Sequence, residues 1–180
     1  MAAHPNDILV FWRQAGPEKW FKQKPAFDEA IRLKFEPVHH AAARGEYDGW
    51  LDTAEGALAL LILLDQFPRN LYRNSGHAFA TDPKARSIAR AAVDAGYDTA
   101  VEPILRHFIY LPFEHSEDLA DQDFGLALCA EAGDADNLKW AKIHRDIIAR
   151  FGRFPHRNRA LGRVTTPDEQ AFLDEGGFGG

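Results

Sequence analysis

The sequence has little cysteine, few strand-forming patterns and no long apolar run. Cys129 is its only cysteine, so neither an intrachain disulfide nor a zinc site built from several cysteines can form. Alternating runs of β-branched residues between tight turns are almost absent, which argues against a β-sheet. The longest apolar run, residues 57–64, is far too short to span a bilayer.

Positive charge is also in short supply. The chain has 21 Lys and Arg against 27 Asp and Glu, which gives a net charge of −6. Non-specific binding to nucleic acid needs a net basic face, so we expect no nucleic-acid partner. The first residues show no basic segment followed by a long apolar run, so we expect no signal peptide. These absences predict a cytoplasmic protein with no membrane partner.

Large apolar side chains are plentiful. The 180 residues are 46% hydrophobic and include 13 Phe and 4 Trp, enough to fill the core of one globular domain with aromatic rings. We therefore predict a single domain over residues 1–175. The glycine-rich residues 176–180 are predicted to form a flexible tail.

Helical patterns cover most of the chain, and they predict an all-α fold of about eight helices. The most hydrophobic candidate, 51–66, should end before Pro68, and the candidate 98–110 should stop at Pro112. Ser116 is the expected N-cap of the helix that follows. The other candidate helices begin near Pro5, Pro25, Asp82, Asp134 and Thr166.

Five polar and apolar strings, spread in order along the chain, make it similar to a known bacterial family. They are LLILLDQFPRN (60–70), FATDPKAR (79–86), FIYLPFEHSEDLADQ (108–122), IIARFGRFPHRN (147–158) and LGRVTTPDEQAFL (161–173). On these strings the chain resembles the family catalogued as domain of unknown function 924. The resemblance implies a compact helical fold related to tetratricopeptide-like arrays, and it implies no activity.

One segment is crowded with carboxylates. Glu114, Glu117, Asp118, Asp121 and Asp123 lie within ten residues that contain no Lys or Arg. Carboxylates this close repel one another unless arginines, a cation or water lie beside them. The identity of that partner bears directly on function.

A basic segment, residues 150–163, offers such partners, because it contains five arginines and one histidine and no acid. In one hypothesis these arginines pair with the carboxylates and hold two loops together. In the other, some of them face a cavity and bind a small anion or an acidic or peptide partner. The ligand-binding candidates are Asp65, Arg69, Asn70, Tyr110, Glu114, Asp118, Gln122, Arg153 and Arg157.

An enzyme is the alternative to a binding module. In a hydrolase, Glu114 or His115 would act as general base, while His156 or an arginine stabilises negative charge. No nucleophile elbow, Walker loop or dinucleotide fingerprint occurs, so we expect no cofactor. The sequence therefore leaves enzyme and binding module open.

A metal site is the third hypothesis for the acidic segment. Glu114 and His115, with Glu117 or Asp118, are chemically adequate ligands, and Asp65, His144 or His156 would complete a set. A helix break between Pro112 and Ser116 would keep these side chains from sharing one helix face. We therefore predict no metal ion.

Overall fold

The computed structural model describes residues 3–179, and helices are the only regular elements among them. The predicted all-α class is confirmed. The elements are more numerous and shorter than the eight expected, because prolines and glycines divide several of them. No helix in this described part of the chain has the length and apolar character needed to cross a membrane.

Backbone contacts divide the chain into two compact units. The first comprises residues 1–73 and 77–112, and the second residues 74–76 and 113–180. Each is described below by itself. The prediction of a single domain over 1–175 stays a prediction.

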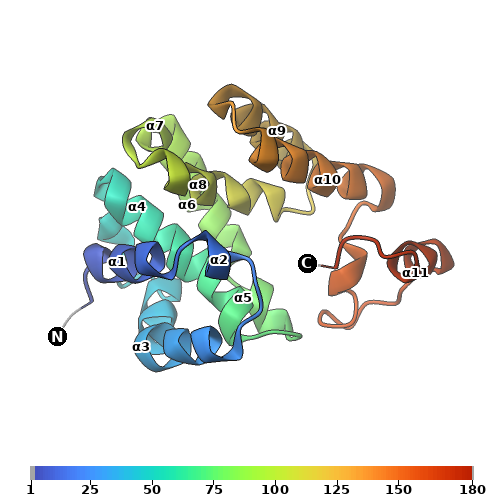
Figure 1. Cartoon of the computed structure of the whole chain (residues 1–180), viewed down its shortest axis with the longest axis horizontal. Helices are drawn as coiled ribbons and strands as arrows, with labels where there is room; N and C mark the ends of the chain where they lie inside the picture. Colours follow the sequence, from blue (N-terminus) through green and yellow to red (C-terminus); the bar gives the residue numbers. More distant parts are fainter. Residues whose placement is uncertain (1–2, 180) are drawn as a thin grey trace. The chain divides into compact units, whose positions relative to one another are not determined.

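The first unit holds most of the helices. They are α1 (Pro5–Ala15), α2 (Pro17–Trp20), α3 (Pro25–Ala43), η1 (Asp48–Asp52), α4 (Ala54–Leu61), η2 (Ile62–Gln66), α5 (Phe67–Leu71), α6 (Asp82–Asp94), α7 (Tyr97–Ala100) and the first part of α8 (Pro103–Glu114). The short η3 (Gly76–Phe79) has residues in both units. In Figure 1, α4 lies between α1 and α6.

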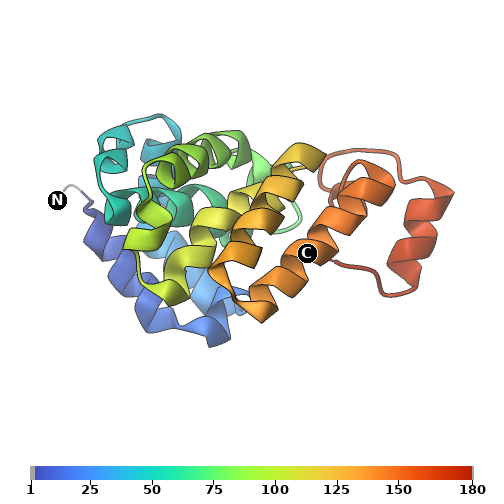
Figure 2. The same ribbon diagram turned by 90° about the horizontal axis from the view of Figure 1, so that it is seen from above.

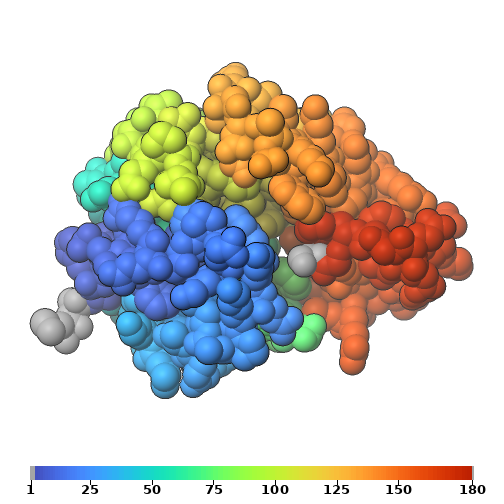
Figure 3. Space-filling model, in the orientation of Figure 1, coloured from blue at the N-terminus to red at the C-terminus, as the bar shows by residue number. Residues whose placement is uncertain are grey.

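The core of this first unit is built around α4 and a group of aromatic rings. Residues 57–64 are at most 1% exposed, as expected of a helix that is apolar on all sides. The Trp12 ring lies 5.7 Å from that of Phe67 and 5.4 Å from that of Phe108, both edge-on. Phe11 joins α1 to α3, and Figure 3 shows the side chains of these two helices in contact on one face.

Pro68 does not end the hydrophobic helix as expected. Residues Ile62–Gln66 form a π-helical turn, in which the Phe67 backbone N–H donates to the Ile62 carbonyl, and α5 continues past Pro68 to Leu71. The wider turn accommodates the proline ring and places Pro68 in the first turn of α5, where its missing N–H costs little. The prediction of a stop at Pro68 was wrong.

Two further boundaries near prolines differ from the prediction. The helix expected over 98–110 is broken at Val101, which has an extended conformation, and Pro103 starts a new helix two residues later. That helix, α8, then runs through Pro112 to Glu114 instead of stopping. The price of an interior proline is one lost hydrogen bond.

The second unit contains α9 (Leu119–Ala132), α10 (Ala135–Phe151), η4 (Pro155–Arg157) and α11 (Pro167–Asp174). Gly133, in the left-handed conformation, and the N-cap Asp134 turn the chain between α9 and α10, which lie side by side in Figure 2. The capping box predicted at Thr166 is also present. Ser116 is not an N-cap, because Asp118 takes that position by accepting from the Ala120 N–H.

A small apolar cluster holds the end of the second unit together. Ile147, Ile148 and Phe154 are buried, and the partly buried Phe172 and Phe178 pack against them. The Phe178 ring lies 4.6 Å from the ring of His144, while the Gly177 N–H donates to the Phe172 carbonyl. The predicted mobility of residues 176–180 stays a prediction, and residue 180 lies outside the described part of the chain.

Candidate functional site

Arg69 lies in the first unit and is occupied by carboxylates. Its two terminal nitrogens each donate to one oxygen of Asp82, both at 3.0 Å, and the carboxylate of Asp65 lies 3.3 Å away. Burial alone lowers the pKa of Arg69, but these two carboxylates raise it above its ordinary value. The arrangement ties α5 to α6, so Arg69 serves as a bridge between helices in this structure.

Two other predicted ligand residues of the first unit also have partners within it. The Asn70 amide donates to a carboxylate oxygen of Asp28 at 2.7 Å, and Arg73 donates to both oxygens of that carboxylate. The Tyr110 hydroxyl donates to the buried Asp98 at 2.8 Å. Asn70 and Tyr110 thus contact different carboxylates, and no described hydrogen bond joins them to each other.

In the second unit, the acidic and basic segments do meet. Arg163 donates from both terminal nitrogens to Glu117, at 2.7 and 3.0 Å, and the Phe154 N–H donates to the same carboxylate at 2.8 Å. Burial raises the pKa of Glu117, but these donors lower it more, so its net pKa lies below the ordinary value. Arg157, only 6% exposed, donates to the His115 carbonyl. This part of the pairing hypothesis agrees with the geometry.

Arg153 has a partner that the sequence analysis missed. It donates to both oxygens of Glu169, a residue outside the acidic segment that is 2% exposed. The same carboxylate accepts from the Asn158 amide and the Thr166 N–H. The hydrogen bonds from Arg153 and from Thr166 lower the pKa of Glu169 to about 2, although burial raises it. The capping box identified Glu169 in the sequence, but its ion pair with Arg153 forms only when the chain is folded.

The remaining acids of the segment also have local partners. Asp121 accepts from the Ser116 hydroxyl at 2.8 Å, and Asp123 accepts from Arg145 at 2.9 Å. The exposed Asp118 caps α9. Repulsion within the segment is therefore relieved mainly by hydrogen bonds from the protein itself.

Glu114, one of the three catalytic candidates, belongs to a buried polar group. It is 1% exposed, one carboxylate oxygen lies 3.5 Å from the Cys129 sulfur, and the other lies 3.6 Å from Nδ1 of His144. The buried amide of Gln122 donates to the backbone carbonyls of Glu114 and Ser116, both at 2.6 Å. A general base must be reached by its substrate, and burial keeps the Glu114 carboxylate from solvent.

The other two catalytic candidates are half-buried. The His115 ring lies 6.2 Å from the ring of His144, and the His156 ring lies 5.3 Å from that of Phe178. Each therefore packs against a neighbouring ring of the second unit.

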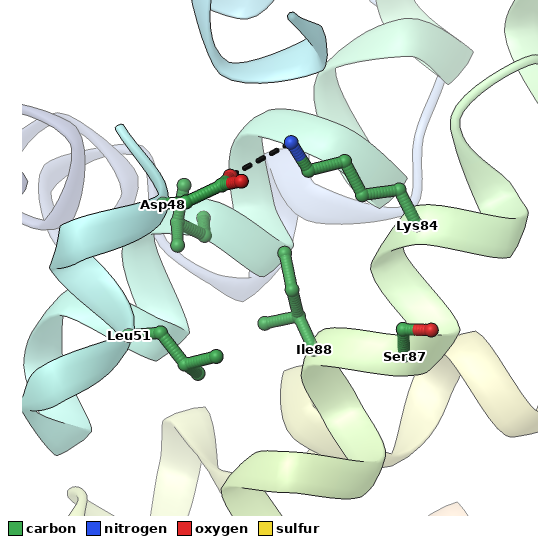
Figure 4. Close-up of a pocket in the computed structure, with 6 residues that line it drawn as sticks. Asp48, Leu51, Lys84, Ser87 and Ile88 are labelled. Carbon is green, nitrogen blue, oxygen red and sulfur yellow. Dashed lines mark ion pairs between the residues drawn. The ribbon is translucent and has the colours of Figure 1, made fainter. Parts of the chain in front are cut away.

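A hollow of about 230 Å³ lies within the first unit, and none of the candidate site residues predicted from the sequence lines it. It is lined by Asp48, Leu51, Leu60, Lys84, Ser87 and Ile88, which come from η1, α4 and α6. In Figure 4, the Lys84 side chain extends toward Asp48 and the Ile88 side chain points toward this ion pair. Leu51 lies on the same side of the view as Asp48. The hollow is therefore largely apolar, with one ion pair beside it.

Backbone geometry places the walls of this hollow. The Lys84 ammonium lies 2.7 Å from a carboxylate oxygen of Asp48 and donates to the Ala42 carbonyl at 2.9 Å, near the end of α3. Gly56 lets η1 pack closely on α4, because a Cβ there would lie 1.9 Å from the Trp50 carbonyl oxygen. No motif marks this site in the sequence, since its residues are ordinary ones spread over 41 positions, from 48 to 88.

Comparisons with known proteins place the chain among bacterial proteins of unknown function. The profile of the family described as "Bacterial protein of unknown function (DUF924)" matches residues 8–177. A solved structure, of a protein of unknown function from Agrobacterium tumefaciens, is 51% identical with a TM-score of 0.92, over 95% of this chain and 97% of that one. The comparison with curated proteins gives no match.

Proposed function

The chain belongs to the DUF924 family of bacterial proteins of unknown function, and we propose that it is a binding module that holds a small molecule in the hollow between η1, α4 and α6. The observation that carries the proposal is the combination of an apolar wall with a charged mouth. Leu60 and Ile88 are almost completely buried, while Asp48 and Lys84 lie beside them. Small-molecule sites commonly combine an apolar lining with a few polar groups.

The volume of the hollow sets the size of its ligand. An apolar cavity of about 150 Å³ is enough to hold benzene, so about 230 Å³ suits a compound of roughly six to nine non-hydrogen atoms. The gain per such atom is at most about 1.5 kcal/mol for the best small ligands and falls to about 0.3 kcal/mol for larger ones, and this shallow site should fall toward the lower value. At about 0.3 to 0.6 kcal/mol per atom, we expect dissociation constants of roughly 0.1 to 50 mM for simple fragments.

The arginine clusters give less support to an anion site. Arg69 and Arg153 each form paired hydrogen bonds to a carboxylate, and Arg157 donates to a backbone carbonyl while its guanidinium lies 4.5 Å from the Phe154 ring centre. An external anion would have to displace these partners. Lys84 also has a carboxylate partner, Asp48, but that side chain is 61% exposed, so a small anion would displace it more readily.

The hydrolase alternative likewise has less support than binding. Its base would be Glu114, which is buried, or His115, which is half-buried against the ring of His144. The proposal retains a cytoplasmic location, with neither nucleic acid nor membrane as partner. The net charge of −6 argues against a nucleic-acid partner.

Methyl NMR tests the proposal directly. Fragments with a branched apolar body should shift the methyl signals of Leu51, Leu60 and Ile88 in a saturable way. Leu51→Trp should fill the hollow and abolish these shifts, whereas the matched Leu33→Trp, at a side chain that is 76% exposed, should preserve them. Unchanged methyl signals across a library of such fragments would rule the site out.

A further inference from the structure

The Lys84 ammonium has capacity for one more partner. An ammonium carries three N–H donors, and the described contacts of Lys84 are the Asp48 carboxylate at 2.7 Å and the Ala42 carbonyl at 2.9 Å. The carbonyl of Ala42 lies in the last turn of α3, where the partial negative charge of the helix favours a cation. Lys84 is thus fixed at the mouth of the hollow.

Asp48, in contrast, is loosely held. Its side chain is 61% exposed, against 28% for Lys84, and it lies on the short η1. Exposed ion pairs contribute little to stability, because water solvates both charges well when they separate. The carboxylate can therefore leave Lys84 at small cost, whereas Lys84 keeps the carbonyl of Ala42.

Space beside the pair is preserved by Gly45. This residue has φ +89°, a conformation that side chains disfavour, and a Cβ on it would lie 3.0 Å from an Asp48 oxygen and 3.6 Å from Lys84 Nζ. Position 45 therefore places no side chain between an incoming group and the ammonium. Ile88 follows Lys84 by one helical turn, so both side chains face the hollow from α6.

We propose that the ligand of this hollow is a small carboxylate with a branched apolar body, and that its carboxylate replaces that of Asp48 on Lys84. This inference rests on the proposed function. Asp48 then acts as an internal substitute that keeps the ammonium paired until the ligand arrives. An amine is disfavoured, because the fixed charge at the mouth is Lys84 and the displaceable one is Asp48.

Three compounds that differ only in the head group separate the alternatives. 4-Methylpentanoate, 4-methylpentanamide and 4-methylpentylamine share one apolar body and are titrated against the whole chain by methyl NMR. We expect the carboxylate to bind most tightly and the amine least. Lys84→Met should remove the preference for the carboxylate while the amide still binds.

Asp48→Asn tests the exchange itself. Removing the competing carboxylate should tighten binding of 4-methylpentanoate about two- to fivefold, the range set by exposed ion pairs, and leave the amide unchanged. Asp52→Asn is the matched control, because Asp52 is exposed on the same η1 and does not line the hollow. It should leave the carboxylate affinity unchanged.

The outcomes distinguish this inference from the proposed function. If the amide binds as tightly as the carboxylate in the wild type and in Asp48→Asn, carboxylate exchange is wrong but the binding site stands. If no compound shifts the methyl signals, both are wrong. A tripeptide ending in leucine carries the same two groups. Tighter binding of that peptide than of 4-methylpentanoate would identify a polypeptide terminus as the carboxylate, and weaker binding would identify a free acid. The exchange at Asp48 is judged by the Asp48→Asn variant alone.

Discussion

Glu117 and Arg163, 46 positions apart in the sequence, form a two-pronged ion pair at 2.7 and 3.0 Å. Their side chains are 28% and 22% exposed, so the pair is partly shielded from water. The same carboxylate accepts from the Phe154 N–H, which fixes the turn after α10. Glu117, an acid of the crowded segment, thereby holds part of the basic segment 150–163 in place.

Breaking this pair should destabilise the second unit. Glu117→Gln leaves the Arg163 guanidinium with a neutral partner, and we expect a loss of about 1 to 3 kcal/mol in the free energy of unfolding. Chemical denaturation monitored by circular dichroism measures it. Asp118→Asn, at the neighbouring exposed N-cap, should cost less, because Asn caps helices about as well as Asp. Equal losses in the two variants would contradict a special role for Glu117.

Glu169 should make stability depend on acid pH. Its pKa is about 2 in the folded chain against an ordinary value of 4.5, so its ionised form stabilises the fold fully above about pH 4.5. That contribution is lost as pH falls from 4.5 toward 2. Melting temperatures measured over pH 2–7 should therefore fall less steeply with acid in Glu169→Gln, which starts from a lower value at pH 7. Parallel curves for wild type and variant would show that Glu169 is not the titrating group.

Gly56 should be indispensable for the packing of η1. A methyl group there would lie 1.9 Å from the Trp50 carbonyl oxygen, so Gly56→Ala must push η1 away from α4. We expect a loss of about 1 to 3 kcal/mol in stability, as for other overpacked sites, together with weaker binding in the hollow. Gly49→Ala on the same η1 is the control, because a Cβ there meets nothing within 4 Å. Thermal unfolding of both variants checks the prediction, which similar melting temperatures would refute.

Cys129 should be inert toward thiol reagents in the folded protein. Its side chain is buried, and that burial together with the neighbouring Glu114 raises the pKa of the thiol, which suppresses the reactive thiolate. With Ellman's reagent at pH 8, we expect no rapid release of chromophore from the native protein and one equivalent in denaturant. Rapid labelling without denaturant would instead indicate that α9 opens readily.

The helices and their caps were determined largely by the sequence. Periodic apolar residues and local signals such as Asp134 and Thr166 act within a few residues of where they stand, so they can be identified without the fold. The predicted boundaries were wrong at Pro68, where a π turn lets the helix continue, at Pro103, which starts a new helix, and at Pro112, which lies inside a helix. The N-cap predicted at Ser116 was also wrong, because Asp118 takes that position. The packing around each proline decides whether the helix stops, widens or continues there.

Only the tertiary structure decided which charges meet. The sequence supplied acids and arginines in two segments, but the partner of Arg153 proved to be Glu169, and that of Arg69 proved to be Asp82 as well as Asp65. Such pairs depend on how helices pack, which no local pattern encodes. The hollow beside Lys84 is a still clearer case, because its walls are ordinary residues that become a site only when η1, α4 and α6 come together.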